Sequence, residues 1–112
     1  MATETIGDFS NVANREAAEA LYAEGKLERI LLFPSRLGGK DIPLNVVYVP
    51  KGISAMKDKI TETLVQMFKD GKINKLAVDP EYKGASFIPS RIKIRAWHTD
   101  RKGEFNTAIE VW

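Results

Sequence analysis

The sequence predicts an α+β domain built from two helix–strand–strand halves and one further strand, with a largely antiparallel sheet and both helices on one face of it. Three observations predict this fold class: an internal similarity, two helix-like apolar patterns that each end at a glycine, and strand-like segments that follow each helix. The chain has 112 residues, of which 44% are apolar and 29% charged. Residues 1–112 are therefore expected to form a single domain.

The internal similarity pairs residues 14–50 with residues 60–96 without a gap. Seven of the 37 aligned pairs are identical, where about two are expected by chance from ordinary residue usage. Several identities fall on glycine and proline, including the pair Gly25 and Gly71. The sequence therefore predicts a structural repeat over these two segments.

The first half begins with a helix. Asn11 or Asn14 can cap it, and apolar residues at three- and four-residue spacing continue to about Glu24. Gly25 suits the left-handed position that follows a helix. The segment 1–12 before it is polar, and we expect it to be flexible.

The second half repeats this pattern with a longer helix. Ser54 is the expected N-cap, and Gly71 is the expected end. The apolar side chains recur at helical spacing between them, at Met56, Ile60, Leu64 and Met67. The methionines are interpreted as core residues, since flexible apolar side chains commonly fill core space.

Five segments have the composition of strands. Two of them stop before a proline, two are entered through an Ile-Pro pair, and one closes the chain; they are 27–33, 73–79, 44–49, 91–97 and 105–112. Segment 91–97 alternates most clearly, because Ile92, Ile94 and Ala96 share one face. The polar turn 99–103 predicts a hairpin between the last two strands.

This element order resembles a circularly permuted ferredoxin-like βαββαβ fold. The resemblance is an analogy of element order and involves no shared motif. It implies one antiparallel sheet with two helices on one face. The fifth strand exceeds that template, so it must lie at an edge, replace a template strand or pair with another molecule.

Composition excludes several classes of function. The chain has no cysteine and only one histidine, His98, so disulfide scaffolds, zinc fingers, iron–sulfur sites and multi-histidine metal sites are excluded. We expect no cofactor and no metal. The longest apolar run is far too short to span a membrane, and the first residues lack a secretory signal, which favours a cytoplasmic location.

The sequence offers only weak candidates for catalysis. The segment 37–41 has two glycines before a lysine without the spacing of a phosphate-binding loop. Asp58 and Glu62 lie at helical spacing among lysines and are interpreted as surface ion-pair partners. His98 with the nearby Asp100 could in principle act as a general base, but the sequence favours a surface histidine at a hairpin end.

The charge distribution points to a binding surface. Residues 1–28 carry a net charge of −4 and residues 29–112 a net charge of +6. The basic residues concentrate in the segment 83–102. The candidate partner-binding residues are Arg91, Lys93, Arg95 and Trp97 on one face of a strand, extended by Lys83, Arg101 and Lys102 in the flanking loops.

The sequence therefore favours a small non-catalytic binding or interaction module that uses an open sheet face to bind a protein or an anionic partner. Self-association through this face or through the last strand is a further possibility, with Trp97, Trp112, Val47 and Val49 as candidate apolar contacts. One alternative is single-stranded nucleic-acid binding through strand 91–97, where cations accompany an aromatic ring. Glu110 would weaken that alternative if it shares the face. A small enzyme is a second alternative.

Overall fold

The computed structural model describes residues 8–112 and shows an α+β fold, as the sequence predicts. Two helices and five strands follow one another in the order α1 (Arg15–Ala23), β1 (Leu27–Leu31), β2 (Val46–Pro50), α2 (Ile53–Lys69), β3 (Lys75–Tyr82), β4 (Pro89–Trp97) and β5 (Glu104–Glu110). Two short 3-10 turns, Ser35–Leu37 and Pro43–Asn45, lie between β1 and β2.

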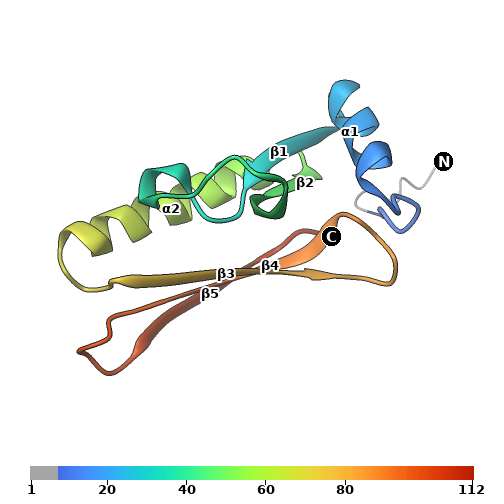
Figure 1. Ribbon diagram of the computed structural model, residues 1–112. Coiled ribbons are helices and arrows are strands. Elements are labelled where there is room, and N and C mark those ends of the chain that lie inside the picture. Colours follow the sequence, from blue (N-terminus) through green and yellow to red (C-terminus); the bar gives the residue numbers. More distant parts are fainter. Residues whose placement is uncertain (1–7) are drawn as a thin grey trace.

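The strands form two antiparallel sheets, which corrects the expected single sheet of a permuted ferredoxin-like fold. β1 pairs with β2, and β3, β4 and β5 form a separate sheet with β4 in the centre. Figure 1 shows α2 and the β1–β2 hairpin in one layer, with the three-stranded sheet below it and α1 at one end. The hairpin lies between the larger sheet and α1, because Val47 and Val49 of β2 face the sheet while Val46 and Tyr48 face α1, so both sets of apolar side chains are buried.

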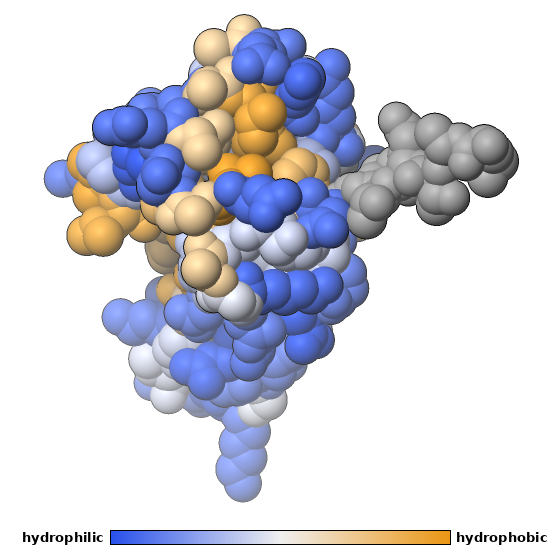
Figure 2. Space-filling view, turned by 90° about the vertical axis from the view of Figure 1, so that its right-hand side faces the viewer, coloured by the Kyte–Doolittle hydropathy of each residue, from blue (hydrophilic) through white to orange (hydrophobic). Residues whose placement is uncertain are grey.

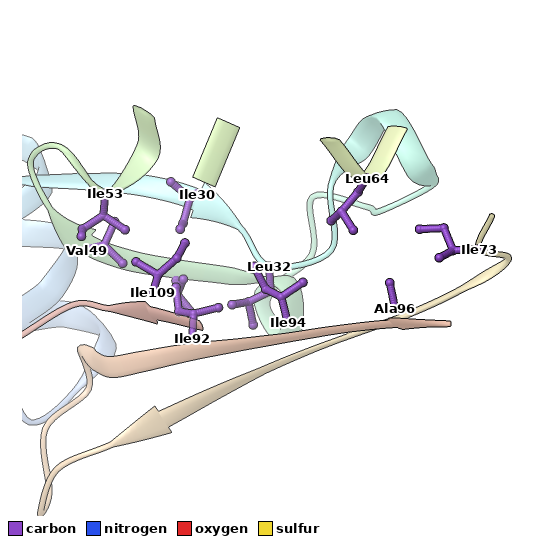
Figure 3. Packing of buried hydrophobic residues seen from close by; sticks show 11 residues of the cluster. Ile30, Leu32, Val49, Ile53, Leu64, Ile73, Ile92, Ile94, Ala96 and Ile109 are labelled. Atoms are coloured by element: carbon purple, nitrogen blue, oxygen red, sulfur yellow. The ribbon is translucent and has the colours of Figure 1, made fainter. Parts of the chain in front are cut away.

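The main core lies between these two layers (Figure 3). Ile92, Ile94 and Ala96 of β4 are at most 2% exposed and point toward the upper layer, which confirms the alternation predicted for this strand. From above they meet apolar side chains of β1, β2 and α2, which include Ile30, Val49, Ile53 and Leu64. Only one face of the three-stranded sheet is thereby covered.

A second apolar cluster lies on the other side of the hairpin, against α1. Val46 and Tyr48 of β2 pack there with Ala18 of α1, whereas Val47 and Val49 point into the main core. The expectation that Val47 and Val49 lie on an open sheet face is therefore wrong. The reason is that β2 is covered from both sides.

The segment before α1 belongs to this second cluster. Val12 is buried, and its carbonyl accepts a hydrogen bond from the Phe87 amide at 2.6 Å. The Phe9 carbonyl accepts a hydrogen bond from Ser86 Oγ at 2.7 Å. Of the segment 1–12 that the sequence predicts to be flexible, residues 1–7 lie outside the described residues.

Hydrogen bonds to the first backbone amides of each helix determine where α1 and α2 begin. Asn14 is the N-cap of α1, where its side chain accepts a hydrogen bond from the Ala17 amide at 2.8 Å. The predicted Ser54 cap is wrong: α2 begins at Ile53, after Gly52. The side chain of Glu28 reaches over from β1 and accepts hydrogen bonds from the Gly52 and Ser54 amides at 3.1 and 3.0 Å, so a distant residue satisfies the free amides that Ser54 was expected to cap.

The strand ends also differ from those predicted. β3 continues through Pro80 to Tyr82, because β3 is an edge strand and the missing amide hydrogen of proline costs no sheet hydrogen bond on its open side. β1 stops at Leu31, where the 34–45 segment turns away. β5 ends at Glu110, and the following Val111 and Trp112 amides donate to the Ser90 carbonyl.

The helix–strand–strand order occurs twice along the chain, as α1–β1–β2 and as α2–β3–β4. Gly25 and Gly71 both follow their helix with positive φ, of 77° and 70°. The halves differ elsewhere, since α1 has 9 residues and α2 has 17. Pro34 precedes a 3-10 turn, whereas its counterpart Pro80 lies inside β3. The two halves therefore share an element order, and the duplication stays a prediction.

Candidate functional site

The open face of the three-stranded sheet carries the central residues of the predicted site. Arg91, Lys93 and Arg95 are exposed and Trp97 is half-buried, all on the face of β4 that points away from the core. The strand register then fixes their neighbours. Across from them lie Glu81, Asp79, Ala77 and Lys75 on β3, and Glu110, Ala108, Asn106 and Glu104 on β5.

Acidic residues neutralise one end of this face. Arg91 Nε lies 2.8 Å from a carboxylate oxygen of Glu110, and Arg91 Nη1 lies 3.9 Å from Glu81. Lys93 Nζ is also 3.9 Å from Glu81. All four side chains are about half exposed or more, so these ion pairs contribute little to stability. They nevertheless reduce the net positive charge at the Arg91 end.

Arg95 is arranged differently from its two neighbours. Its guanidinium carbon lies 4.6 Å from the centroid of the Trp97 ring, which is cation–π geometry. Its cross-strand partners are Ala77 and Asn106, neither of which is charged. None of the ion pairs found within residues 8–112 involves Arg95. The positive charge of Arg95 therefore faces solvent, and Trp97 holds it in place.

A shallow hollow of about 450 Å³ lies on this face. Its lining includes the cations Arg91, Lys93 and Arg95, the acid Asp79, and small or polar residues of β5, Asn106, Thr107 and Ala108. The hollow exists because the β5 residues across from Lys93 and Arg95 have short side chains. Three cations and one acid thus line a depression that is open to a ligand.

The loop residues of the predicted site lie at opposite ends of the sheet. Arg101 and Lys102 occupy the β4–β5 turn and line a second depression together with Trp97. Lys83 lies beyond the other end of β3. Its Nζ donates a hydrogen bond to the Trp112 carbonyl at 2.7 Å and lies 4.8 Å from the Trp112 ring centroid. The structure therefore places Arg101 and Lys102 beside Trp97 and Lys83 away from it.

Trp112 is held inside the molecule's second apolar cluster. Its ring packs edge-on against Phe9, and its Nε1 donates a hydrogen bond to the Ile88 carbonyl at 3.1 Å. Figure 2 shows that hydrophilic side chains cover the lower part of the molecule, where the three-stranded sheet lies, while apolar side chains gather in the upper layer. Of the two tryptophans, Trp97 is the one on the open sheet face.

The weak catalytic candidates of the sequence make contacts with neighbouring parts of the chain. The ring Nδ1 of His98 accepts a hydrogen bond from the Asp100 amide at 3.0 Å, so the Asp100 backbone rather than its carboxylate contacts the imidazole. Glu62 binds Arg36 at 2.6 Å across to another element. Gly39 lies against the backbone of Phe33, where a Cβ would meet the carbonyl oxygen at 1.8 Å. Close packing therefore accounts for that glycine.

Reasoning from the sequence left open whether Glu110 shares the open face, and it missed Asp79 and Glu81. Both acids alternate in the segment 75–82, and that alternation was the available signal. This signal was not used, because the strand was expected to end before Pro80. The structure shows instead that acids flank the cationic strand on both sides.

Searches for a membrane span and a metal site in the described part of the chain, and for related proteins, all found nothing. Among residues 8–112, no helix is long and apolar enough to cross a membrane, and no cluster of acidic and histidine side chains could hold a metal ion. The chain matches no protein-family model, no curated protein and no solved structure.

Proposed function

We propose that the chain is a binding module that docks an acidic, extended segment of a protein partner on the outer face of the β3–β4–β5 sheet. The proposal rests on the state of the Arg95 side chain. It is exposed, stacked on Trp97 and without a carboxylate partner in the described part of the chain, at the edge of a hollow that also contains Lys93.

The spacing of the cations favours an extended polypeptide. Side chains two residues apart on a strand lie about 6.6–6.8 Å from each other. Lys93 and Arg95 have this separation along β4, and so do alternate acidic side chains of a segment that runs along β4. Such a segment would place its acids over Lys93 and Arg95 and meet the apolar ring of Trp97 at one end.

The acids beside β4 oppose the nucleic-acid alternative. Asp79 and Glu81 lie on one side of the cationic strand, and Glu104 and Glu110 lie on the other. A nucleic-acid backbone carries negative charge along its whole length, so it would be repelled wherever it crosses these rows. A peptide, in contrast, can carry acidic side chains solely at the positions that lie over β4 and neutral ones elsewhere. The aromatic content of the face is also low for base stacking, which commonly uses several rings.

The experiment measures binding of a fluorescently labelled peptide that has glutamate at alternate positions, by anisotropy at low salt. We expect the Arg95→Gln variant to bind about three- to fivefold more weakly, because an exposed charge pair contributes up to ~1 kcal/mol. Lys51→Gln is the matched control, since Lys51 is exposed in the turn before α2, away from the open sheet face.

Two results would contradict the proposal. One is binding that does not depend on Arg95. The other is tighter binding of a single-stranded oligonucleotide of equal charge, which would favour the nucleic-acid alternative instead. High salt should weaken the peptide complex, since the contacting charges are exposed.

A further inference from the structure

A third pocket, of about 240 Å³, lies in the other layer, between α2, β1 and the 3-10 turn after β1. α2 lies alongside β1 in Figure 1. The lining is rich in cations and hydroxyl groups; its polar members are Arg29, Ser35, Arg36, Ser54, Lys57, Asp58 and Thr61. The three residues Ser54, Lys57 and Thr61 share one face of α2 because they are three and four positions apart.

Lys57 is the unusual member of this pocket. It is only 5% exposed, although lysine is almost never fully buried without a partner. None of the ion pairs or side-chain hydrogen bonds found within residues 8–112 involves it. Burial lowers the pKa of Lys57 to about 8, and the nearby charge of Asp58 opposes that change. The stem of Lys57 is buried, while its ammonium group opens onto the pocket, since no buried side-chain nitrogen in the described part of the chain lacks a partner. An anion in the pocket would contact this ammonium group directly.

The two arginines of the pocket already have carboxylate partners. Arg29 binds both oxygens of Asp41, with nitrogen–oxygen distances of 3.1 and 2.5 Å. Arg36 binds Glu62 at 2.6 Å. An arginine fork is the group best matched to a planar carboxylate. Arg29 uses both of its terminal nitrogens for Asp41, whereas Arg36 uses only Nη1 for Glu62. Lys57 is therefore the one cation of this pocket without a carboxylate partner in the described part of the chain.

We propose that this pocket binds the phosphate group of a small molecule, with Lys57 as the principal cation and Ser54 and Thr61 as hydroxyl donors. A lysine binds phosphate as a point charge, and single hydroxyl donors approach a tetrahedral oxyanion from separate directions. The pocket volume is several times the ~30 Å³ occupied by one water molecule in the liquid, so it has room for the group and a short substituent. Asp58 also lines the pocket and is exposed, so it opposes part of the positive charge at the rim.

This inference does not depend on the proposed function. The phosphate pocket belongs to the layer of α2 and β1, whereas the docking surface is the outer face of the three-stranded sheet. No residue lines both.

The test is a titration of the 15N-labelled protein with inorganic phosphate at constant ionic strength, followed through the backbone amides of residues 35, 54 and 61. We expect saturable shifts at these amides. In the Lys57→Met variant the dissociation constant should rise at least about tenfold, as expected for loss of a hydrogen bond to a charged group. The matched control is Lys59→Met, which removes an exposed lysine of the same helix and should change the constant less than about twofold.

Three further arms make the result decisive. Methyl phosphate that binds as tightly as phosphate identifies a phosphate ester as the ligand class, and methyl phosphate that binds much more weakly identifies free phosphate. Acetate should bind at least about tenfold more weakly, and equal binding of acetate would overturn the assignment. The absence of saturation with phosphate, or equal losses in both lysine variants, would also overturn it. A methionine at position 57 retains the length of the side chain, and the amide spectrum of the variant confirms that it is folded.

Discussion

Lys57 is expected to destabilise the folded protein at neutral pH, and replacing it should reveal by how much. Burial lowers its pKa from 10.5 to about 8. Each tenfold change in proton affinity corresponds to 1.36 kcal/mol, so the charged folded state is disfavoured by about 3 kcal/mol at most. Because Lys57 borders an open pocket, solvent reduces this figure, and we expect Lys57→Met to raise the free energy of unfolding by about 1–3 kcal/mol at pH 7.

The pH dependence of this gain has a defined sign. Below about pH 8 Lys57 is protonated in both states and the cost is constant. Between about pH 8 and 10.5 the folded state has released the proton while the unfolded state still binds it, so the wild-type protein becomes more stable relative to the variant as pH rises.

The assay is urea unfolding of the wild type, Lys57→Met and Lys59→Met at pH 7 and near pH 10.5. The stability gain of Lys57→Met over the wild type should shrink between these pH values, and the exposed control should show no such trend. A gain that is absent at pH 7, or that is the same at both pH values, would refute the reasoning.

The remaining predictions concern the segment between β1 and β2 and the start of α2. Asn45→Ala should lower the free energy of unfolding by about 2 kcal/mol, because the Asn45 side chain donates to the Phe33 carbonyl and accepts from the Phe33 amide; urea unfolding measures it, and a loss below about 0.5 kcal/mol would contradict this role. Gly39→Ala should destabilise more than Gly38→Ala, since only the former adds a carbon 1.8 Å from an oxygen while the latter costs about 1–2 kcal/mol through its positive φ; the reverse order of thermal midpoints would disprove it. Glu28→Ala should cost about 1 kcal/mol by uncapping α2, and an unchanged midpoint would show that water replaces the cap.

Local patterns predicted the helices and the central strand well. Asn14 and Gly25 delimit α1 because capping and positive φ depend on residues adjacent in the sequence. The alternation of β4 predicted its open face for the same reason. The internal duplication of residues 14–50 and 60–96 is not tested by the arrangement of the elements and stays a prediction.

Features that depend on distant contacts could not be predicted in this way. The start of α2 is set by Glu28, which lies in another element, so the local Ser54 signal misled. Pro80 is tolerated because β3 is an edge strand, and edge position follows from topology rather than from composition. The sequence also did not show that β1 and β2 would form a separate hairpin, covered by the larger sheet on one side and by α1 on the other.

The same distinction applies to the candidate site. Residues on one strand, such as Lys93 and Arg95, could be grouped from alternation alone. The net charge around them could not be predicted, because it depends on which residues of β3 and β5 the register places beside them. The burial of Lys57 likewise follows from the packing of α2 against β1, and the amphipathic pattern of α2 did not indicate it.

The most direct test of the docking surface uses the two tryptophans as internal probes. Trp97 lies on the open sheet face beside Arg95, and Trp112 lies in the second apolar cluster. Titration with the alternating glutamate peptide should move the indole N–H resonance of Trp97 in a saturable way and leave that of Trp112 in place. Movement of Trp112 alone, or of neither indole, would contradict docking on the outer face of the β3–β4–β5 sheet.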